Sequence, residues 1–135
     1  MTRARSIRSP LVTKRGSEGA VLRRLRGICL SYPETTETES WGHPNFRAGK
    51  RTFVAFEMIK RRPSIAFRVA PADARRTGRG NLFFKTPYGQ GRWVSLWADS
   101  ALDWPLVRDL AERSYRGVAL RRMLAELGRS RRRRG

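Results

Sequence analysis

The fold is decided by residues 40–59, SWGHPNFRAGKRTFVAFEMI, in which turn-forming residues alternate with strand-forming ones. Gly49 lies in a turn at residues 48–51, which joins residues 45–47 to residues 52–59 as a β-hairpin. The second of these strands carries apolar residues at both odd and even positions. A strand that is apolar on both faces is predicted to lie in the middle of a sheet.

Further strands follow this hairpin. Residues 64–69 alternate apolar with small or charged side chains and predict a strand with one face on the core. Residues 93–98 predict another strand. The connecting segments are then an acidic loop at 33–39, turns at 42–44 and 60–63, and a short helix with a basic loop at 71–80.

Helices are predicted on both sides of the strands. Apolar residues recur at helical spacing over residues 18–31, and Ser17 can cap this helix. Asp103 can cap a second helix that has Pro105 in its first turn, and a short last helix ends near Gly128. The predicted inner face of the second helix consists of Leu106, Val107, Leu110, Ala111, Ser114 and Val118. Helix, antiparallel strands and helices in this order indicate an α+β domain.

Strongly basic segments flank this domain. Residues 1–16 contain five basic residues and no acidic one, and residues 129–135 contain five arginines. We expect a disordered basic arm over 1–16, an α+β domain over 17–128 and a disordered Arg-rich tail over 129–135. The first segment also has the composition of an organelle transit peptide, although a solvated arm is the preferred interpretation.

Composition excludes several classes of protein. No apolar stretch approaches the roughly 18 residues of a membrane-spanning helix, and no signal-peptide core follows Met1. The single cysteine, Cys29, lies on the apolar stripe of the first helix and predicts a buried thiol in a reducing, cytoplasmic setting. One histidine and one cysteine exclude a zinc site built from three or four such ligands. We expect no cofactor, and the sequence has no recognisable catalytic constellation.

Charge is the strongest indication of function. Thirty Lys and Arg residues oppose 11 Asp and Glu residues, which gives a net charge of +19. Such a surface attracts polyanions, because each phosphate contact releases condensed counterions. We therefore expect a nucleic-acid partner and no membrane. A general arginine bias is the alternative explanation, since 26 of the 30 basic residues are Arg.

Several separated motifs resemble the MmcQ/YjbR family over about residues 20–127. Its signature hairpin is matched by Trp41, Gly42, His43, Pro44, Phe46 and Arg47. Further matches are residues 30–33, residues 49–53, the late strand at 91–96 with Trp93, residues 103–104 and 114–116, and the basic pair Arg121 and Arg122. The chain departs from the family pattern at residues 118–120, where a proline often precedes the basic pair.

The resemblance implies both a fold and a function. The fold is like that of the frataxin-type CyaY proteins, with an antiparallel sheet covered by helices. The function is "double-wing" DNA binding. We therefore expect DNA rather than RNA, contacted through basic hairpin turns and basic tails.

The candidate DNA contacts are basic residues that cluster at turns. The planar guanidinium group suits both phosphates and guanine edges, and a hairpin tip is rigid enough to enter a groove. The candidates are Arg47, Lys50 and Arg51 on one turn, Lys60, Arg61 and Arg62 on the next, Arg75, Arg76 and Arg79 in the following loop, and Arg121 and Arg122 on the last helix. This hypothesis requires the hairpin tips to converge on one side of the molecule.

Two other functions stay open at this point. One is a pocket for an anionic ligand or substrate around His43, Arg47, Tyr88 and Trp93. The other is a protein-interaction module with an acidic partner. For the aromatic side chains of Trp41, Phe46 and Trp93, core packing is favoured over base stacking, and Tyr88 is expected to be the exposed member. For His43 we favour a structural role in holding its turn.

Overall fold

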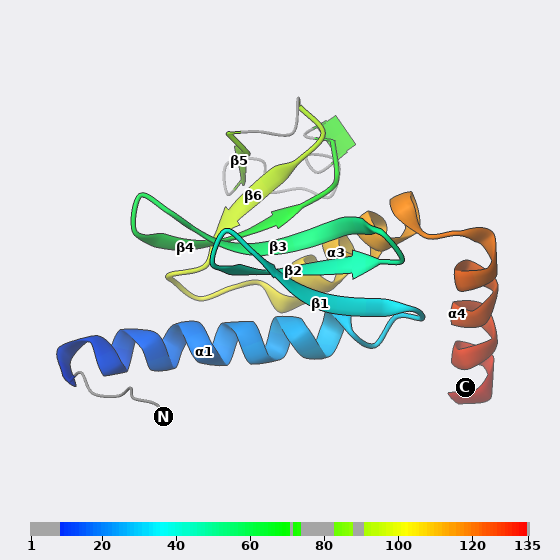
Figure 1. Ribbon diagram of the computed structural model, residues 1–135, viewed down its shortest axis with the longest axis horizontal. Coiled ribbons are helices and arrows are strands. Elements are labelled where there is room, and N and C mark those ends of the chain that lie inside the picture. Colours follow the sequence, from blue (N-terminus) through cyan, green and yellow to red (C-terminus); the bar gives the residue numbers. More distant parts are fainter. Residues whose placement is uncertain (1–8, 71, 74–82, 88–90, 135) are drawn as a thin grey trace.

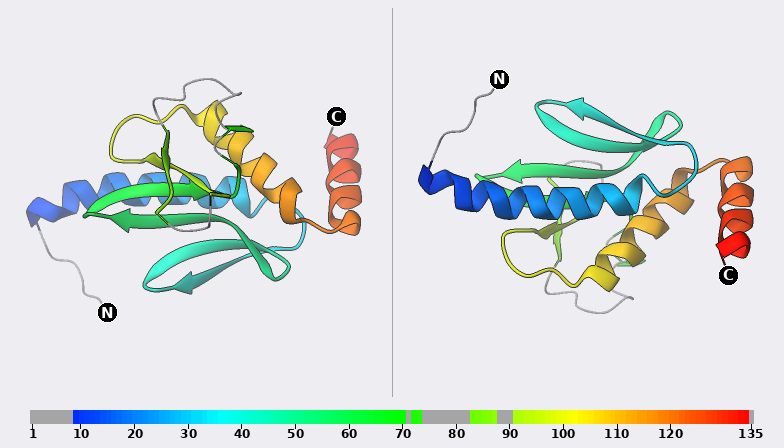
Figure 2. Two further views of the ribbon diagram at one scale, coloured as in Figure 1. Left: turned by 90° about the horizontal axis from the view of Figure 1, so that it is seen from above. Right: turned by 90° about the horizontal axis from the view of Figure 1, so that it is seen from below.

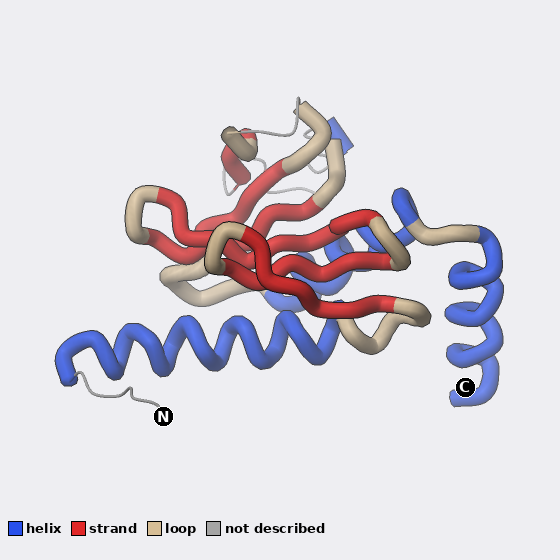
Figure 3. The backbone as a smooth tube through the Cα atoms, viewed as in Figure 1, coloured by secondary structure: helices blue, strands red, loops and turns tan. Residues whose placement is uncertain are grey.

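The computed structural model describes residues 9–70, 72–73, 83–87 and 91–134 (Figure 1). In chain order its elements are α1 (Ser9–Cys29), β1 (Thr35–Ser40), β2 (His43–Ala48), β3 (Arg51–Ile59), β4 (Arg62–Phe67), β5 (Phe83–Lys85), β6 (Val94–Trp97), α3 (Trp104–Val118) and α4 (Arg121–Arg134). The six strands form one sheet in the order β1-β2-β3-β4-β6-β5, and every neighbouring pair is antiparallel. Figure 3 shows these strands in red and the helices in blue. The α+β class is confirmed.

The two faces of the sheet differ in chemistry. One row across four strands is apolar and consists of Phe56, Ile65, Leu96 and Phe83. The neighbouring row points to the opposite face and consists of Asn45, Ala55, Ala66 and Ser95. The apolar face joins the hydrophobic core, in which α3 contacts β3 and β4 and α1 contacts α3. Figure 2 shows α1 running across the sheet in the view from below. The opposite face, called the polar face below, carries small and polar side chains instead.

A β-bulge in β3 adjusts which side chains reach each face. Phe46 pairs with Val54 but Arg47 pairs with Thr52, so Phe53 is the extra residue. Its ring meets Tyr115 of α3 edge-on, with 5.6 Å between ring centroids. The bulge therefore turns one more aromatic ring toward the helices and leaves Thr52 and Arg47 on the polar face.

Helix α3 forms as its sequence predicts. Asp103 is its N-cap and accepts a hydrogen bond from the backbone N–H of Leu106, and a proline occupies the first turn. All six residues of the predicted inner face are buried, together with Tyr115, whose hydroxyl donates to the carbonyl of Pro33 over 2.9 Å. Cys29 of α1 is fully buried, as predicted, and burial raises the pKa of its thiol.

The prediction of disorder is wrong for those parts of residues 1–16 and 129–135 that the structure describes. Helix α1 begins at Ser9 instead of residue 18, with Pro10 in its first turn, so Ser17 lies within the helix and is not its cap. Helix α4 continues through Gly128 to Arg134. Glu126 pairs with Arg129 and Arg133, and these contacts favour the helix that composition alone argued against.

Three further expectations need correction. The acidic loop predicted at 33–39 is mostly the edge strand β1, where threonines favour extended backbone and Glu37 pairs with Arg26 of α1 at 2.5 Å. The first hairpin turn is Trp41–Gly42, because β2 already begins at His43. Strand β5 was not predicted. Most of the helix and loop predicted at 71–80 lies outside the described residues.

Candidate nucleic-acid interface

The two basic hairpin turns lie at opposite ends of the sheet, which overturns the expected convergence of their tips. The turn with Lys50 precedes β3, and the turn with Lys60 and Arg61 follows it. Nine residues of extended strand place these turns about 30 Å apart, at about 3.4 Å per residue. Figure 1 shows one turn at each end of β3. One hairpin pair cannot therefore present both tips to the same groove.

Helix α4 brings other residues that were predicted to contact DNA close to the β2–β3 turn. A Cβ placed on Gly49 would lie 3.1 Å from Cε of Met123, and the backbone N–H of Gly49 donates to the carbonyl of Glu34 over 3.1 Å. The carboxylate of Glu34 in turn accepts two hydrogen bonds from Arg122, at 2.8 and 2.9 Å. The β2–β3 turn and the first turn of α4 therefore form one end of the molecule.

The basic residues predicted to contact DNA differ in whether their side chains are already paired within the protein. Arg62 is held by Asp99 at 2.6 Å and lies over the ring of Trp97, with 3.8 Å from Cζ to the ring centroid. Arg47 donates to the carbonyl of Lys50 and is only half-exposed. Five predicted cations are exposed and have no acidic partner among the described residues: Lys50, Arg51, Lys60, Arg61 and Arg121. Arg75, Arg76 and Arg79 lie outside the described residues.

Helix α4 concentrates positive charge beside the β2–β3 turn. It carries seven arginines and one glutamate over 14 residues. Arg121 and Arg132 are eleven residues apart, about three helical turns, so they share one face, which lies opposite the buried Met123. Both side chains therefore point away from the body of the protein.

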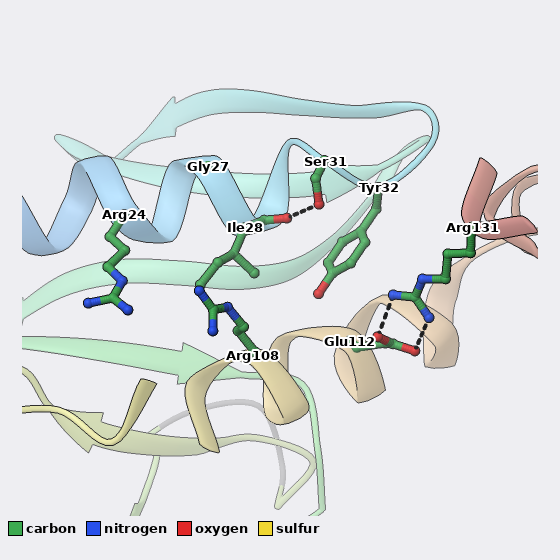
Figure 4. A pocket seen from close by; sticks show the side chains of 8 residues that line it. All are labelled: Arg24, Gly27, Ile28, Ser31, Tyr32, Arg108, Glu112 and Arg131. Atoms are coloured by element: carbon green, nitrogen blue, oxygen red, sulfur yellow. Dashed lines mark hydrogen bonds and ion pairs between the residues drawn. The ribbon is translucent and has the colours of Figure 1, made fainter. Parts of the chain in front are cut away.

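The carboxylate of Glu112 in α3 links this helix to α4 through an ion pair. Glu112 accepts from Arg131 at 2.7 and 3.0 Å and also pairs with Arg116 at 2.8 Å. These guanidinium groups, Arg131 above all, lower the pKa of Glu112 to about 2. Figure 4 shows this pair at one end of a groove of about 480 Å³ between the helices, with Arg24 and Arg108 on its walls. The basic surface of α4 thus continues toward α1 and α3.

The opposite end of the sheet carries two tight turns with unusual backbone angles. The loops Trp41–Gly42 and Lys60–Arg61 each join strands through two residues that both have positive φ, as a type I′ turn requires. Such turns favour Asn and Gly, but three of these four residues are not glycine, with φ of +55° at Trp41, +51° at Lys60 and +67° at Arg61. Trp41 is also 95% exposed, so the expectation that it packs in the core is wrong.

A pocket of about 350 Å³ opens on the polar face and extends from the Trp41 turn along the sheet to Thr52, which follows Arg51 of the other basic turn. Its walls include Trp41, His43, Asn45, Thr52, Glu57 and Trp93. Nε2 of His43 lies 3.9 Å from the buried carboxylate of Glu57. His43 and Trp93, two members of the predicted ligand pocket, are therefore together. Arg47 shares their face without lining the pocket, and Tyr88 lies outside the described residues.

Glu57 is the residue of this pocket that the sequence prediction missed. It is the single charged residue of the strand predicted over residues 52–59, whose other residues are apolar except Thr52. Burying a carboxylate within an apolar strand costs free energy unless the carboxylate is paired. The position of Glu57 in the sequence therefore already indicates a residue with a special role. Among the described residues no group of three or more His, Cys, Asp or Glu side chains is arranged to hold a metal ion, and no helix there could cross a membrane.

Comparison with known proteins finds a family and a solved structure that are similar to this chain. The family model described as YjbR matches residues 30–117, which is more than half of the chain. The chain belongs to the YjbR family. The crystal structure of Deinococcus radiodurans protein DR2400, which contains the family-model domain DUF419, is similar with a TM-score of 0.62 and 19% sequence identity. That similarity covers 79% of this chain and 87% of the other, and no curated protein matches the sequence significantly.

The YjbR match divides the molecule into two parts. It spans the whole sheet and nearly all of α3, including the pocket and both basic turns. Helix α4 lies beyond it, and α1 precedes it. The arginines of α4 are therefore an addition to the part of the chain that the family model describes.

Proposed function

We propose that this YjbR-family protein binds DNA and contacts the phosphate backbone with one end of the molecule. The contact surface consists of Lys50 and Arg51 at the β2–β3 turn and Arg121 and Arg132 on α4, and is called the turn–helix surface below. The observation that supports it most directly is the contact of Gly49 with Met123, because it joins two basic segments that are far apart in the sequence.

The surrounding acidic residues support this choice of surface. Glu34, Glu112 and Glu126 each pair with arginines, which neutralises the negative charge near α4. The four cations of the turn–helix surface are exposed and have no acidic partner among the described residues. Duplex DNA carries one negative charge per about 1.7 Å of helix axis, so an end with several unneutralised cations meets many phosphates.

A salt titration with blunt duplex DNA tests the proposal. The variant Lys50→Gln/Arg51→Gln/Arg121→Gln removes three of the four proposed contacts. Each phosphate contact contributes about 0.9 to the slope of log affinity against log salt concentration. We expect the slope to fall in magnitude by about 2.7, with a matching loss of affinity at low salt. Duplex RNA of the same sequence is measured in parallel and is expected to bind more weakly.

The matched control removes the same charge elsewhere. Lys60→Gln/Arg61→Gln/Arg92→Gln also replaces three exposed cations, none of them on the turn–helix surface. It should leave the duplex slope nearly unchanged. Equal losses in both variants would mean that net charge alone determines binding, as the arginine-bias explanation requires, and the proposed surface would then be wrong.

A further inference from the structure

The groove between α1 and α3 has arginines on both of its walls (Figure 4). Arg24 belongs to α1 and Arg108 to α3, and Arg131 of α4 lies at one end. Among the described residues that line the groove, only Glu112 is acidic, and it is already paired with Arg131 and Arg116. Three arginines therefore oppose one neutralised carboxylate, and the groove attracts an anion.

Two of these arginines lie close together and have no acidic partner among the described residues. The guanidinium group of Arg24 lies over the ring of Trp104, with 4.4 Å from Cζ to the ring centroid. Trp104 and Arg108 are four residues apart in α3, so they are neighbours on one face of that helix. The contact with Trp104 therefore holds Arg24 beside Arg108, and Figure 4 shows both side chains directed into the groove from opposite walls.

A tyrosine hydroxyl points into the same groove. The side chain of Tyr32 is 94% buried by its 6% exposure, and its ring stacks on Tyr115 with 4.7 Å between ring centroids. Its hydroxyl makes no hydrogen bond to a described residue, and Figure 4 shows it between Arg108 and the Glu112–Arg131 pair. Burial raises the pKa of Tyr32, so the hydroxyl stays protonated and can donate. A polar group in this position needs an acceptor from outside the protein.

Gly27 leaves the α1 wall of the groove open. It lies within α1, where glycine is less favourable than alanine. A Cβ at this position would meet no atom of the described residues within 4 Å, so packing does not require glycine there. Arg24, Gly27 and Ile28 share one face of the helix, because they are three and four residues apart. The missing side chain therefore lets a bound group approach the backbone beside Arg24.

Size and charge narrow the ligand to a small dianion. The groove volume of about 480 Å³ lies within the roughly 300–1,000 Å³ range of ligand pockets. Arg24 and Arg108 together balance two negative charges, and with Tyr32 they supply donors from three directions. The three terminal oxygens of a tetrahedral phosphoryl group can accept from such an arrangement, whereas the two oxygens of a carboxylate lie in one plane. Ile28 supplies an apolar surface for an attached organic group.

We propose that this groove binds the terminal phosphoryl group of a phosphate monoester. Arg24 and Arg108 contact its oxygens from opposite walls, and the hydroxyl of Tyr32 donates to a third oxygen. The organic part lies along Gly27 and Ile28. A small organic phosphate and the 5′ end of a nucleic-acid strand both carry this group. The site uses no residue of the turn–helix surface and does not depend on it.

Calorimetric titration of the full chain tests the proposal. The first probe is phenyl phosphate, which is a dianion at about pH 8 because the second pKa of a phosphate monoester is about 6. The second is benzenesulfonate, which has a similar shape and one negative charge. We expect phenyl phosphate to bind about tenfold more tightly, because its additional charge strengthens the hydrogen bonds from both arginines.

The variant Arg24→Gln/Arg108→Gln removes both proposed cations. It should bind phenyl phosphate about tenfold more weakly or worse. Arg23→Gln/Arg113→Gln is the matched control, because it removes one exposed arginine from each of the same helices and neither residue lines the groove. The control should bind phenyl phosphate within about twofold of the original protein, since salt screens distant surface charges.

Two further variants separate binding from stability. Gly27→Leu places a side chain in the groove, and leucine favours a helix, so this variant should unfold at a higher temperature while losing affinity for phenyl phosphate. Tyr32→Phe keeps the ring that stacks on Tyr115 and removes only the donor. It should weaken binding by about fivefold, because one hydrogen bond to a charged group is lost.

Tetrathymidylate with and without a 5′-phosphate identifies the source of the phosphoryl group. A gain in affinity from the 5′-phosphate that disappears in Arg24→Gln/Arg108→Gln assigns the groove to strand ends. No such gain, together with binding of phenyl phosphate, assigns it to small organic phosphates. Either result supports the inference.

Two results would overturn the inference. One is equal affinity for phenyl phosphate and benzenesulfonate, and the other is an equal loss of affinity in the groove variant and its matched control. The Lys50→Gln/Arg51→Gln/Arg121→Gln variant should bind phenyl phosphate as the original protein does. Failure of the groove would therefore leave the proposed duplex surface unaffected, and failure of that surface would leave the groove unaffected.

Discussion

At the scale of single residues, the β3–β4 turn carries backbone strain that a substitution can relieve. Arg61 has a φ of +67°, which costs a non-glycine residue about 1–2 kcal/mol. Glycine has no such penalty but loses more entropy on folding, by roughly 0.5–1 kcal/mol. We therefore expect Arg61→Gly to raise the free energy of unfolding by about 0.5–1 kcal/mol in urea denaturation.

A glycine at the other basic turn provides the comparison. Lys50 is not among the residues with positive φ, so Lys50→Gly gains no relief from strain and should lower the free energy of unfolding by about 0.5–1 kcal/mol. Opposite signs for the two variants would show that backbone strain, not basic charge, sets the stability of these turns. A loss of stability in both would contradict the assigned strain.

The sequence alone predicted the burial or the role of some side chains correctly and of others incorrectly. The buried state of Cys29 and the capping role of Asp103 followed from local spacing, and both are observed. The exposure of Trp41 did not follow, because a tryptophan beside a strand usually packs inward. Its position depends on a two-residue turn between β1 and β2, and β1 was not recognised as a strand.

At the scale of secondary-structure elements, the contact between α3 and α4 should depend on pH. The pKa of Glu112 is held at about 2 by Arg131 and Arg116, well below the ordinary value of about 4.5. A carboxylate with a lowered folded-state pKa stabilises the protein above its ordinary pKa, and this contribution is lost as the pH falls toward the folded value. Thermal stability should therefore decline between about pH 5 and pH 2.

The variant Glu112→Gln isolates this contribution. It should be less stable at pH 7, and its stability should fall less steeply between pH 5 and pH 2 than that of the original protein. Asp109→Asn is the matched control, because the ion pair of Asp109 with Arg113 lies within α3. An unchanged pH dependence in Glu112→Gln would show that Glu112 does not link the two helices in solution.

The elements of the fold were more predictable than their ends. Periodicity identified the β2–β3 hairpin, β4, β6 and α3, because their side chains alternate between a core face and an outer face. It missed the start of α1, where residues 9–17 include Pro10 and Gly16 and show no apolar periodicity, and the end of α4, which is rich in arginine. In α4 those turns are held by long-range pairs such as Arg131–Glu112, which local sequence does not encode.

At the scale of the whole molecule, the topology decides how the basic residues can act. Sequence clustering suggested one platform made of both hairpin tips. Consecutive antiparallel hairpins that share β3 must instead turn at opposite ends of that strand, so the candidates divide into two groups. One group lies beside α4 and the other beside the pocket. The candidate contacts therefore cannot act as one platform, and the proposed DNA contacts are those beside α4.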